Sequence, residues 1–250
     1  EQPDVTVNCL SADNMTPLLY ASQFGHNKIV ALLLHRNEVN ISKDKSKTEM
    51  TPIHYASMKG HVKTCSMLLD QIISTTSHDS NALSRKSSKY LALPNSLFVQ
   101  FDQYDNEFLR IDNPNKVKFD INMPSSQFNT PLHYACEYGH CEIVKMLYNR
   151  CPSEFHKVHG LNVNPRDRRS NTPLHKAVMN GYTNLVEVLV QLPKIDVNAI
   201  NSDSKTPLII ATCNESLEIV RILLHAKGIE RNIPDRTMMT APKYADQIGN

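Results

Sequence analysis

The sequence reads Thr130-Pro-Leu-His-Tyr-Ala135 near its centre, and this short stretch decides the fold because the chain repeats it. The other copies and near-copies are Thr16-Pro-Leu-Leu-Tyr-Ala21, Thr51-Pro-Ile-His-Tyr-Ala56, Thr172-Pro-Leu-His-Lys-Ala177, Thr206-Pro-Leu-Ile-Ile-Ala211 and Thr240-Ala-Pro-Lys-Tyr-Ala245. Successive threonines are 35, 79, 42, 34 and 34 residues apart. A recurring period of this size indicates a stack of similar units.

Each copy predicts the start of a short helix. Threonine caps a helix by accepting a backbone N–H bond, and proline at the first helical position gives up a donor that has no partner. Glycine stands nine residues after the threonine in five units, where it can take a positive φ and end the helix: Gly25, Gly60, Gly139, Gly181 and Gly249. Apolar residues then recur at helical spacing, as in Ile219, Val220, Leu223 and Leu224. Each unit therefore predicts two helices.

The composition excludes several classes of protein. Only seven of 250 residues are glycine, which argues against glycine-rich phosphate-binding loops and flexible linkers. The net charge of +2 gives no footprint of a dedicated nucleic-acid binder or of a polybasic membrane-surface protein. The longest apolar run, residues 29–34, is far shorter than the ~20 residues that span a bilayer. Six cysteines without a paired spacing are typical of reduced thiols.

A unit of about 33 residues that carries Thr-Pro-Leu-His-x-Ala resembles the ankyrin repeat. The resemblance covers roughly 200 of the 250 residues. It implies an all-α fold: an ankyrin-repeat solenoid of stacked helix–turn–helix units with β-turn or hairpin fingers. We expect one array over residues 1–250, with about six units that begin near residues 8, 40, 122, 164, 198 and 232. Five of these starts carry an asparagine eight residues before the threonine: Asn8, Asn122, Asn164, Asn198 and Asn232.

The chain departs from the ankyrin pattern at three kinds of place. Glycine usually stands two residues before the threonine, but no unit has it there, so we expect finger turns that differ in detail or carry strain. Glu215 replaces the glycine of the fifth unit, with Asn214 beside it as the expected end of the helix. The sixth unit lacks a second helix before Asn250. A half unit closes a solenoid poorly, so we expect the natural chain to continue.

A long insertion separates the second and third units, and we place it at residues 71–118. Its first part is rich in serine and is expected to be disordered. Its second part contains Phe98, Phe101 and Phe108, and the runs 98–101 and 108–111 could pair as a β-hairpin. The segment could also be a degenerate repeat. We favour a docked or partner-binding loop, because long loops in compact proteins are often functional.

The histidines and tyrosines of the motif are expected to be structural. His54, His133 and His175 stand three residues after the threonine, while His26, His61 and His140 follow the turn glycine. In the ankyrin family both positions support the structure through hydrogen bonds to neighbouring loops. Tyr20, Tyr55 and Tyr134 recur four residues after the threonine and are better explained as a ladder within the stack than as a ligand site. The sequence predicts no catalytic residues, no metal site and no cofactor.

The resemblance implies that variable residues at the fingertips and along the first helices bind protein partners on a concave face. The candidates are Met15, Phe24, Met50, Met58, Lys59, Tyr138, Arg168, Asn180 and Lys205, with Phe98, Phe101 and Phe108 of the insertion. Aromatic, methionine and arginine side chains are frequent at the energetic centres of interfaces. We therefore expect a non-enzymatic, cytoplasmic interaction scaffold that binds its partners on this face. We expect it neither to bind nucleic acid nor to insert into a membrane.

A finer resemblance concerns residues 42–71 and 196–215. The first stretch is similar to part of the cytosolic ankyrin array of TRPA-type cation channels, where a lysine- and serine-rich finger precedes a repeat with a Thr-Cys pair. The second also resembles that array, whereas the long insertion departs from it. The resemblance implies an array at the cytosolic face of a membrane that couples stimuli or partners to a pore, and it implies an oligomer if the chain is part of a channel. The alternatives are a soluble adaptor, and a regulatory array fused to an enzyme or a nuclear signalling protein.

Overall fold

The computed structural model describes residues 7–36, 38–39, 41, 46–76, 120–151 and 160–249, and the regular structure of these residues is helical throughout. The first helices of the units are α1 (Pro17–Gln23), α3 (Pro52–Lys59), α5 (Pro131–Glu137), α7 (Pro173–Met179), α9 (Pro207–Cys213) and α11 (Ala241–Ile248). The second helices are α2 (Asn27–Leu34), α4 (Val62–Thr76), α6 (Cys141–Arg150), α8 (Thr183–Val190) and α10 (Leu217–Leu224). The predicted all-α solenoid of two-helix units is confirmed.

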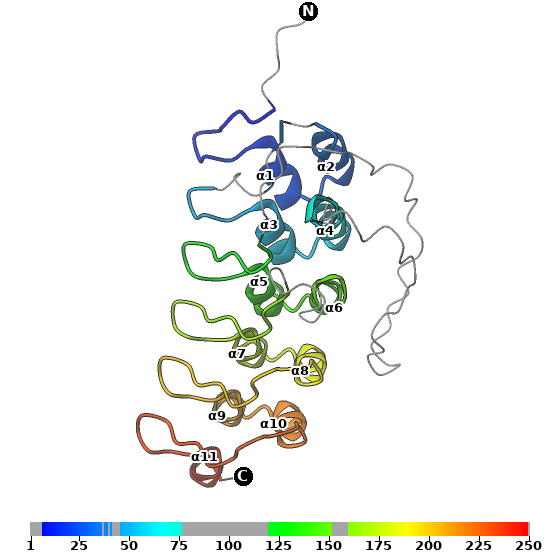
Figure 1. The fold of residues 1–250 in the computed structure, drawn as a ribbon. Helices are drawn as coiled ribbons and strands as arrows, with labels where there is room; N and C mark the ends of the chain where they lie inside the picture. Colours follow the sequence, from blue (N-terminus) through cyan, green and yellow to red (C-terminus); the bar gives the residue numbers. More distant parts are fainter. Residues whose placement is uncertain are drawn as a thin grey trace, which may run out of the picture.

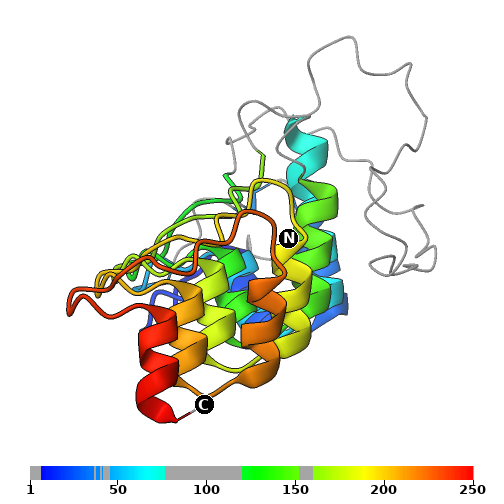
Figure 2. The ribbon, with the colours of Figure 1, turned by 90° about the horizontal axis from the view of Figure 1, so that it is seen from below.

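The helices stack in two columns (Figure 1). The inner column consists of α1, α3, α5, α7, α9 and α11, and the outer column consists of α2, α4, α6, α8 and α10. Each helix contacts the next one in its column and the helix of its own unit in the other column. The connections before the inner helices project to one side as a row of fingers, which Figure 2 shows from below. The sixth unit contributes only α11 to the described part of the chain.

Local signals place the start of each inner helix. All six begin directly after the motif threonine, which has an extended backbone, and all six have proline in the first two helical positions. Thr16 accepts a hydrogen bond from the backbone N of Leu19, and Thr206 accepts one from Ile209. These bonds satisfy donors that have no partner within the helix.

The motif histidines complete the caps and join neighbouring units. Nδ1 of His133 accepts from the backbone N–H of Thr130 at 3.1 Å, so the ring proton is on Nε2. Nε2 then donates to the carbonyl oxygen of Asn171 in the next finger at 3.0 Å. His54 and His175 repeat both bonds. The structural role that the sequence predicted for these three histidines is confirmed.

The residue after the turn glycine reaches back to the previous unit. His61 bonds the carbonyl oxygen of Gln23 at 3.0 Å, and His140 bonds that of Met58 at 3.1 Å. A Cβ atom on Gly25 would lie 2.6 Å from the His61 ring, so glycine at this position makes room for it as well as supplying a positive φ. His26 of the first unit is exposed, and the described residues provide it with no such carbonyl partner.

The asparagines at the unit starts form clamps between units. The side-chain amide of Asn164 donates to the carbonyl oxygen of Lys194 at 2.7 Å, and its oxygen accepts from the backbone N of Asp196 at 2.8 Å. Asn122 and Asn198 make the same pair of bonds to their following units, and Asn8 makes the first of them to Glu38. The recurring asparagine is therefore explained by the joint between repeats.

The finger turns share one geometry, with a left-handed residue at the position where the sequence lacks glycine. The residue two before the motif threonine has a φ of 55° to 61° in every unit: Asn14, Glu49, Phe128, Ser170, Ser204 and Met238. The turn is closed in each case by two backbone hydrogen bonds, as between Asp167 and Asn171 and between Ser170 and Asp167. Five of these six residues are neither glycine nor asparagine, so the strain alternative is the right one. Glu215 likewise has a φ of 54°, just after the predicted helix end at Asn214.

One continuous core runs through the stack between the two columns. Its members include Leu132, Ile143, Leu174, Leu185 and Leu208, each no more than 2% exposed. The buried thiols of Cys65 and Cys136 fill core positions, as predicted, and burial raises the pKa of Cys65 to about 12.

The described part of the insertion is helical. α4 continues to Thr76, so residues 71–76 of the predicted loop are helical, because Ile72 extends the apolar face of Cys65, Leu68 and Leu69 and is itself 7% exposed. The rest of the insertion, with Phe98, Phe101, Phe108 and the proposed hairpin, lies outside the described residues, as does residue 40 at the start of the second unit. None of the helices in the described ranges combines the length and the apolar character that a membrane span needs.

Candidate interaction surface

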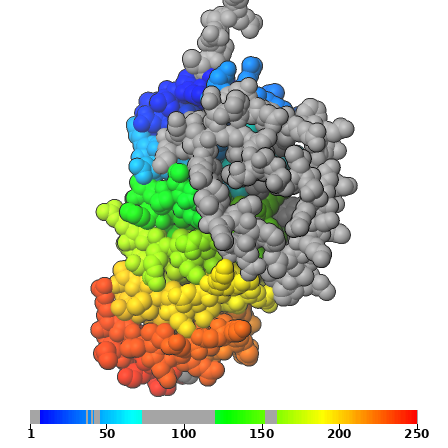
Figure 3. Space-filling model, in the orientation of Figure 1, coloured from blue at the N-terminus to red at the C-terminus, as the bar shows by residue number. Residues whose placement is uncertain are grey.

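The fingers and the inner column together present the candidate surface. Backbone hydrogen bonds join neighbouring fingertips: Ser126 N–H donates to the Thr48 carbonyl at 3.0 Å, and Ser202 N–H donates to that of Arg169 at 2.8 Å. Arg168 N–H bonds the Gln127 carbonyl in the same way at 3.2 Å. The fingers therefore form an ordered row, which follows one edge of the molecule in Figure 3.

A second row lies at the end of the inner helices, eight residues after the motif threonine. Its members are Phe24, Lys59, Tyr138, Asn180, Asn214 and Ile248. Phe24 is 58% exposed and Tyr138 is 49% exposed, which is unusual for large aromatic side chains. Both rings are held by their neighbours, because Phe24 stacks on Tyr20 and His26, and Tyr138 stacks on His140. Burial is the main reason that the pKa of Tyr138 is raised.

Two of the predicted contact residues are buried. Met15 and Met50 are each 6% exposed and pack with Leu19, Tyr55 and Tyr134 in a small cluster between the fingers and the inner column. They stiffen the base of the fingers and offer a partner little area. Tyr55 and Tyr134 share this cluster, so the ladder predicted within the stack is confirmed for them.

The other predicted residues of the described chain lie on the surface. Lys59, Arg168 and Asn180 are exposed, whereas Met58 and Lys205 are half-buried. The ammonium group of Lys205 lies 5.6 Å from the ring centre of Tyr244. Four of the predicted residues lie at the ends of successive inner helices: Phe24, Lys59, Tyr138 and Asn180. Arg168 and Lys205 belong to the fingers. Whether any of them contacts a partner stays a prediction.

Sequence reasoning missed some residues of this surface. Met179 precedes Asn180 in α7 and is 43% exposed, and Arg236 occupies the same finger position as Arg168 two units further along. Alignment of the six fingers by their threonines would have found Arg236, because Arg168 and Arg236 each stand four residues before the threonine of their unit.

Side chains four residues after the threonine are tied to the start of their own finger. Tyr134 and Ser125 hydroxyl groups lie 3.2 Å apart, and the Lys176 ammonium lies 3.1 Å from an Asp167 carboxylate oxygen. Burial works to raise the pKa of Asp167, but hydrogen bonds from Asn171 and Lys176 together hold it below its usual value. These ties fix the fingers against the inner column, so the surface is rigid before any partner arrives.

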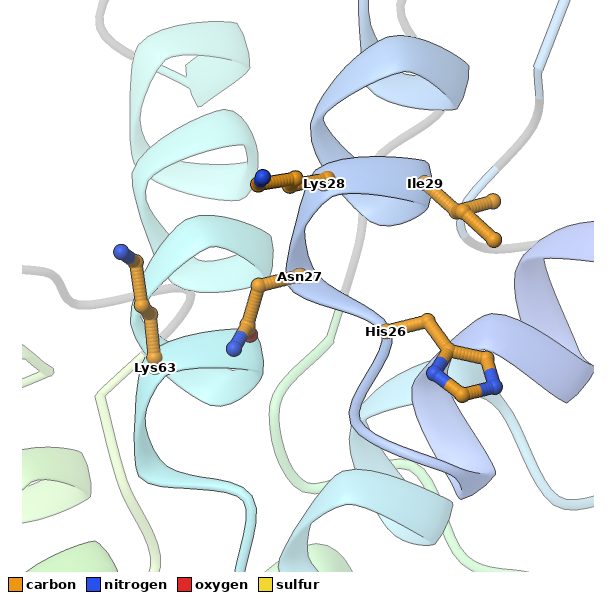
Figure 4. A pocket seen from close by; sticks show the side chains of 5 residues that line it. All are labelled: His26, Asn27, Lys28, Ile29 and Lys63. Carbon is orange, nitrogen blue, oxygen red and sulfur yellow. The ribbon is translucent and has the colours of Figure 1, made fainter.

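Neither the hollows nor the thiols suggest chemistry. A shallow hollow beside α2 and α4 is lined by His26, Asn27, Lys28, Ile29 and Lys63 (Figure 4). Asn27 accepts a hydrogen bond there from the Thr64 hydroxyl. No group of metal-ligating side chains occurs within the described ranges. Cys151, the one cysteine beside an arginine, is 7% exposed, and burial raises its pKa to about 11, which disfavours a reactive thiolate.

Two family models match the chain. The model for ankyrin repeats in three copies matches residues 2–79 and 153–235, and the model for a single ankyrin repeat matches residues 127–157. The matched ranges cover more than half of the sequence and agree with the helix pairs described above. A search of the curated proteins finds no match.

Proposed function

The chain belongs to the ankyrin-repeat family, whose repeats form protein–protein interaction modules, and we propose that it is a non-enzymatic scaffold that binds its partner across the inner column and the fingers. The observation that carries the proposal is the exposure of Phe24 and Tyr138 at one register of the inner column. An exposed aromatic ring that is already held in place by its neighbours loses little side-chain entropy when a partner covers it.

The proposal places the protein in the cytoplasm, as part of a longer signalling protein. The absence of a paired cysteine spacing supports a reducing compartment, and every cysteine is a free thiol. A TRPA-type channel array is the second candidate, favoured by the resemblance of residues 42–71. An array fused to an enzyme or a nuclear signalling protein is the third. Any sequence that the natural protein has outside these residues tests the three candidates, because several long apolar spans would indicate a channel and a catalytic motif would indicate a fused enzyme.

A comparison of three variants tests the proposed surface. The intact chain, the Phe24→Ala/Tyr138→Ala variant and the Leu217→Ala variant are used to capture partners, which are quantified by mass spectrometry. Leu217 is 62% exposed and lies on the outer column, so its variant removes exposed apolar area away from the proposed surface. We expect the double variant to lose a partner that the control retains. Equal capture by all three proteins would contradict the proposal.

A further inference from the structure

The last three fingers differ in charge from the first three. Residues 165–171, 199–205 and 233–239, called here the basic fingers, contain five basic and three acidic residues. The basic residues are Arg166, Arg168, Arg169, Lys205 and Arg236, and the acidic ones are Asp167, Asp203 and Asp235. The charged residues in the described parts of the first three fingers are Asp13, Lys47 and Glu49. The Lys47 ammonium lies 3.5 Å from an Asp13 carboxylate oxygen.

Two of the three acids in the basic fingers are used inside the turns. The Asp167 carboxylate accepts from the backbone N of Arg169 and of Asn171, both at 2.8 Å, and contacts Lys176. The Asp235 residue is 5% exposed and accepts from Thr237, from the backbone N of Met239 and, at 2.6 Å, from the Tyr244 hydroxyl. Their charges are enclosed by donors of the protein itself, so they offer an incoming molecule little negative surface.

Three arginines in the basic fingers lie at the surface. Arg168, Arg169 and Arg236 are exposed, and no side-chain partner for their guanidinium groups occurs in the described part of the chain. Arg166, by contrast, is tied to the carbonyl oxygens of Ser170 and Ile200. The turn explains why the aspartates are enclosed and these arginines are not. Its first residue, Asp167 or Asp235, must be a short hydrogen-bond acceptor, whereas the arginine side chains that follow it take no part in the turn.

The backbone of the fingers relates the free arginines to one another. The backbone bond between Ser202 and Arg169 holds the fourth and fifth fingers side by side. Arg168 and Arg236 occupy one register, with Ser202 at that register in the finger between them. Asp203 is the one exposed acid among the three fingers. The basic fingers therefore carry the exposed guanidinium groups of Arg168 and Arg169 on the fourth finger and that of Arg236 on the sixth, with Ser202 and Asp203 on the finger between them.

We infer that the basic fingers bind an acidic segment of a partner protein, with aspartate or glutamate carboxylates on Arg168, Arg169 and Arg236. This inference rests on the proposed function and names the chemistry of the partner at one end of the same surface. Guanidinium groups recognise carboxylates through two parallel hydrogen bonds, so three exposed guanidinium groups on the fingers favour an acidic peptide. The basic fingers contain no aromatic residue on which unpaired bases could stack, which favours a peptide over a nucleic acid.

A displayed library of random peptides, selected on the intact chain, tests the inference. We expect the enriched peptides to share clustered aspartate and glutamate. The Arg168→Glu/Arg169→Glu/Arg236→Glu variant should bind an enriched peptide at least about ten-fold more weakly, because three exposed ion pairs are lost together. The control variant, Lys28→Glu/Arg221→Glu/Lys227→Glu, makes the same change of charge at exposed residues of the outer column side and should bind as the unmodified protein does. Circular dichroism verifies that both variants are folded.

Other results would overturn the inference. Enriched peptides without acidic residues that depend on Phe24 and Tyr138 would leave the proposed function standing and remove the acidic partner. Peptides that bind independently of both surfaces would remove both proposals. Equal weakening by the two charge variants would indicate unspecific attraction. Single-stranded polyuridine RNA is the last probe: RNA that competes with the peptide and requires the three arginines would replace the acidic peptide by a nucleic acid.

Discussion

His133 donates from Nε2 to the carbonyl oxygen of Asn171, 38 residues further along the chain, at a distance of 3.0 Å. The same ring accepts at Nδ1 from the backbone of Thr130. One neutral imidazole therefore caps its own helix and joins two units at once. Protonation at Nδ1 would remove the acceptor of the Thr130 N–H, so the cap requires the neutral ring, whereas the bond from Nε2 to Asn171 does not.

This requirement predicts a pH dependence of stability. Burial lowers the pKa of His133 and of His175 to about 4, whereas an unfolded histidine has a value of 6.5. Between pH 6.5 and 4 the unfolded chain binds more protons, so the free energy of unfolding falls as the pH falls. Above pH 6.5 neither residue contributes a slope. The loss should approach about 3 kcal/mol for each histidine at pH 4, measured by urea denaturation at a series of pH values.

The His133→Gln/His175→Gln variant isolates this effect. It should be less stable than the unmodified protein at pH 8, because both caps are damaged, and it should lose less stability between pH 6.5 and 4. Asp167 has a lowered pKa, so its effect appears at more acidic pH than that of the histidines. A variant that keeps the full loss of stability in this range would show that other groups cause it.

The asparagine clamps make a second prediction. Asn164→Ala removes the bonds to Lys194 and Asp196 and leaves two backbone groups of the joint without their partner. We expect the free energy of unfolding to fall by about 1–2 kcal/mol, since the site is open to water. Asn232→Ala is the matched control: it occupies the same register of the last unit, where the described residues show no clamp, and it should change stability by less than about 0.5 kcal/mol.

Features with a local cause could be predicted from the sequence. The helix starts follow from Thr-Pro, and the recurring histidines and Asn164 mark joints because their positions repeat. The burial of Met15 and Met50 could not be foreseen, because it depends on Tyr55 and Tyr134 of neighbouring units. The inward turn of Asp167 also escaped the sequence, since a charge count does not distinguish a carboxylate that accepts backbone bonds from one that faces solvent.

The strained finger turns give a third prediction. Ser204 has a φ of 58°, which L residues other than asparagine rarely adopt. Ser204→Gly should raise the free energy of unfolding by about 0.5–1 kcal/mol, as strain relief outweighs the entropy that glycine adds to the unfolded chain. Ser204→Ala keeps the strain and should not stabilise. Thermal and urea denaturation measure the free energy of unfolding of both variants. Equal changes in this free energy for the two variants would show that the turn is unstrained.

The first unit gives the last prediction, because it exposes residues that later units bury. Ile29 is 47% exposed, whereas Ile143, Leu185 and Ile219 at the same register are at most 1% exposed and belong to the continuous core. Ile219→Ala should therefore cost about 2–4 kcal/mol of unfolding free energy through the cavity it creates, and Ile29→Ala less than about 1 kcal/mol. Urea denaturation measures both. Similar losses would mean that Ile29 is covered in solution, which size-exclusion chromatography with light scattering would reveal if a second copy of the chain covers it.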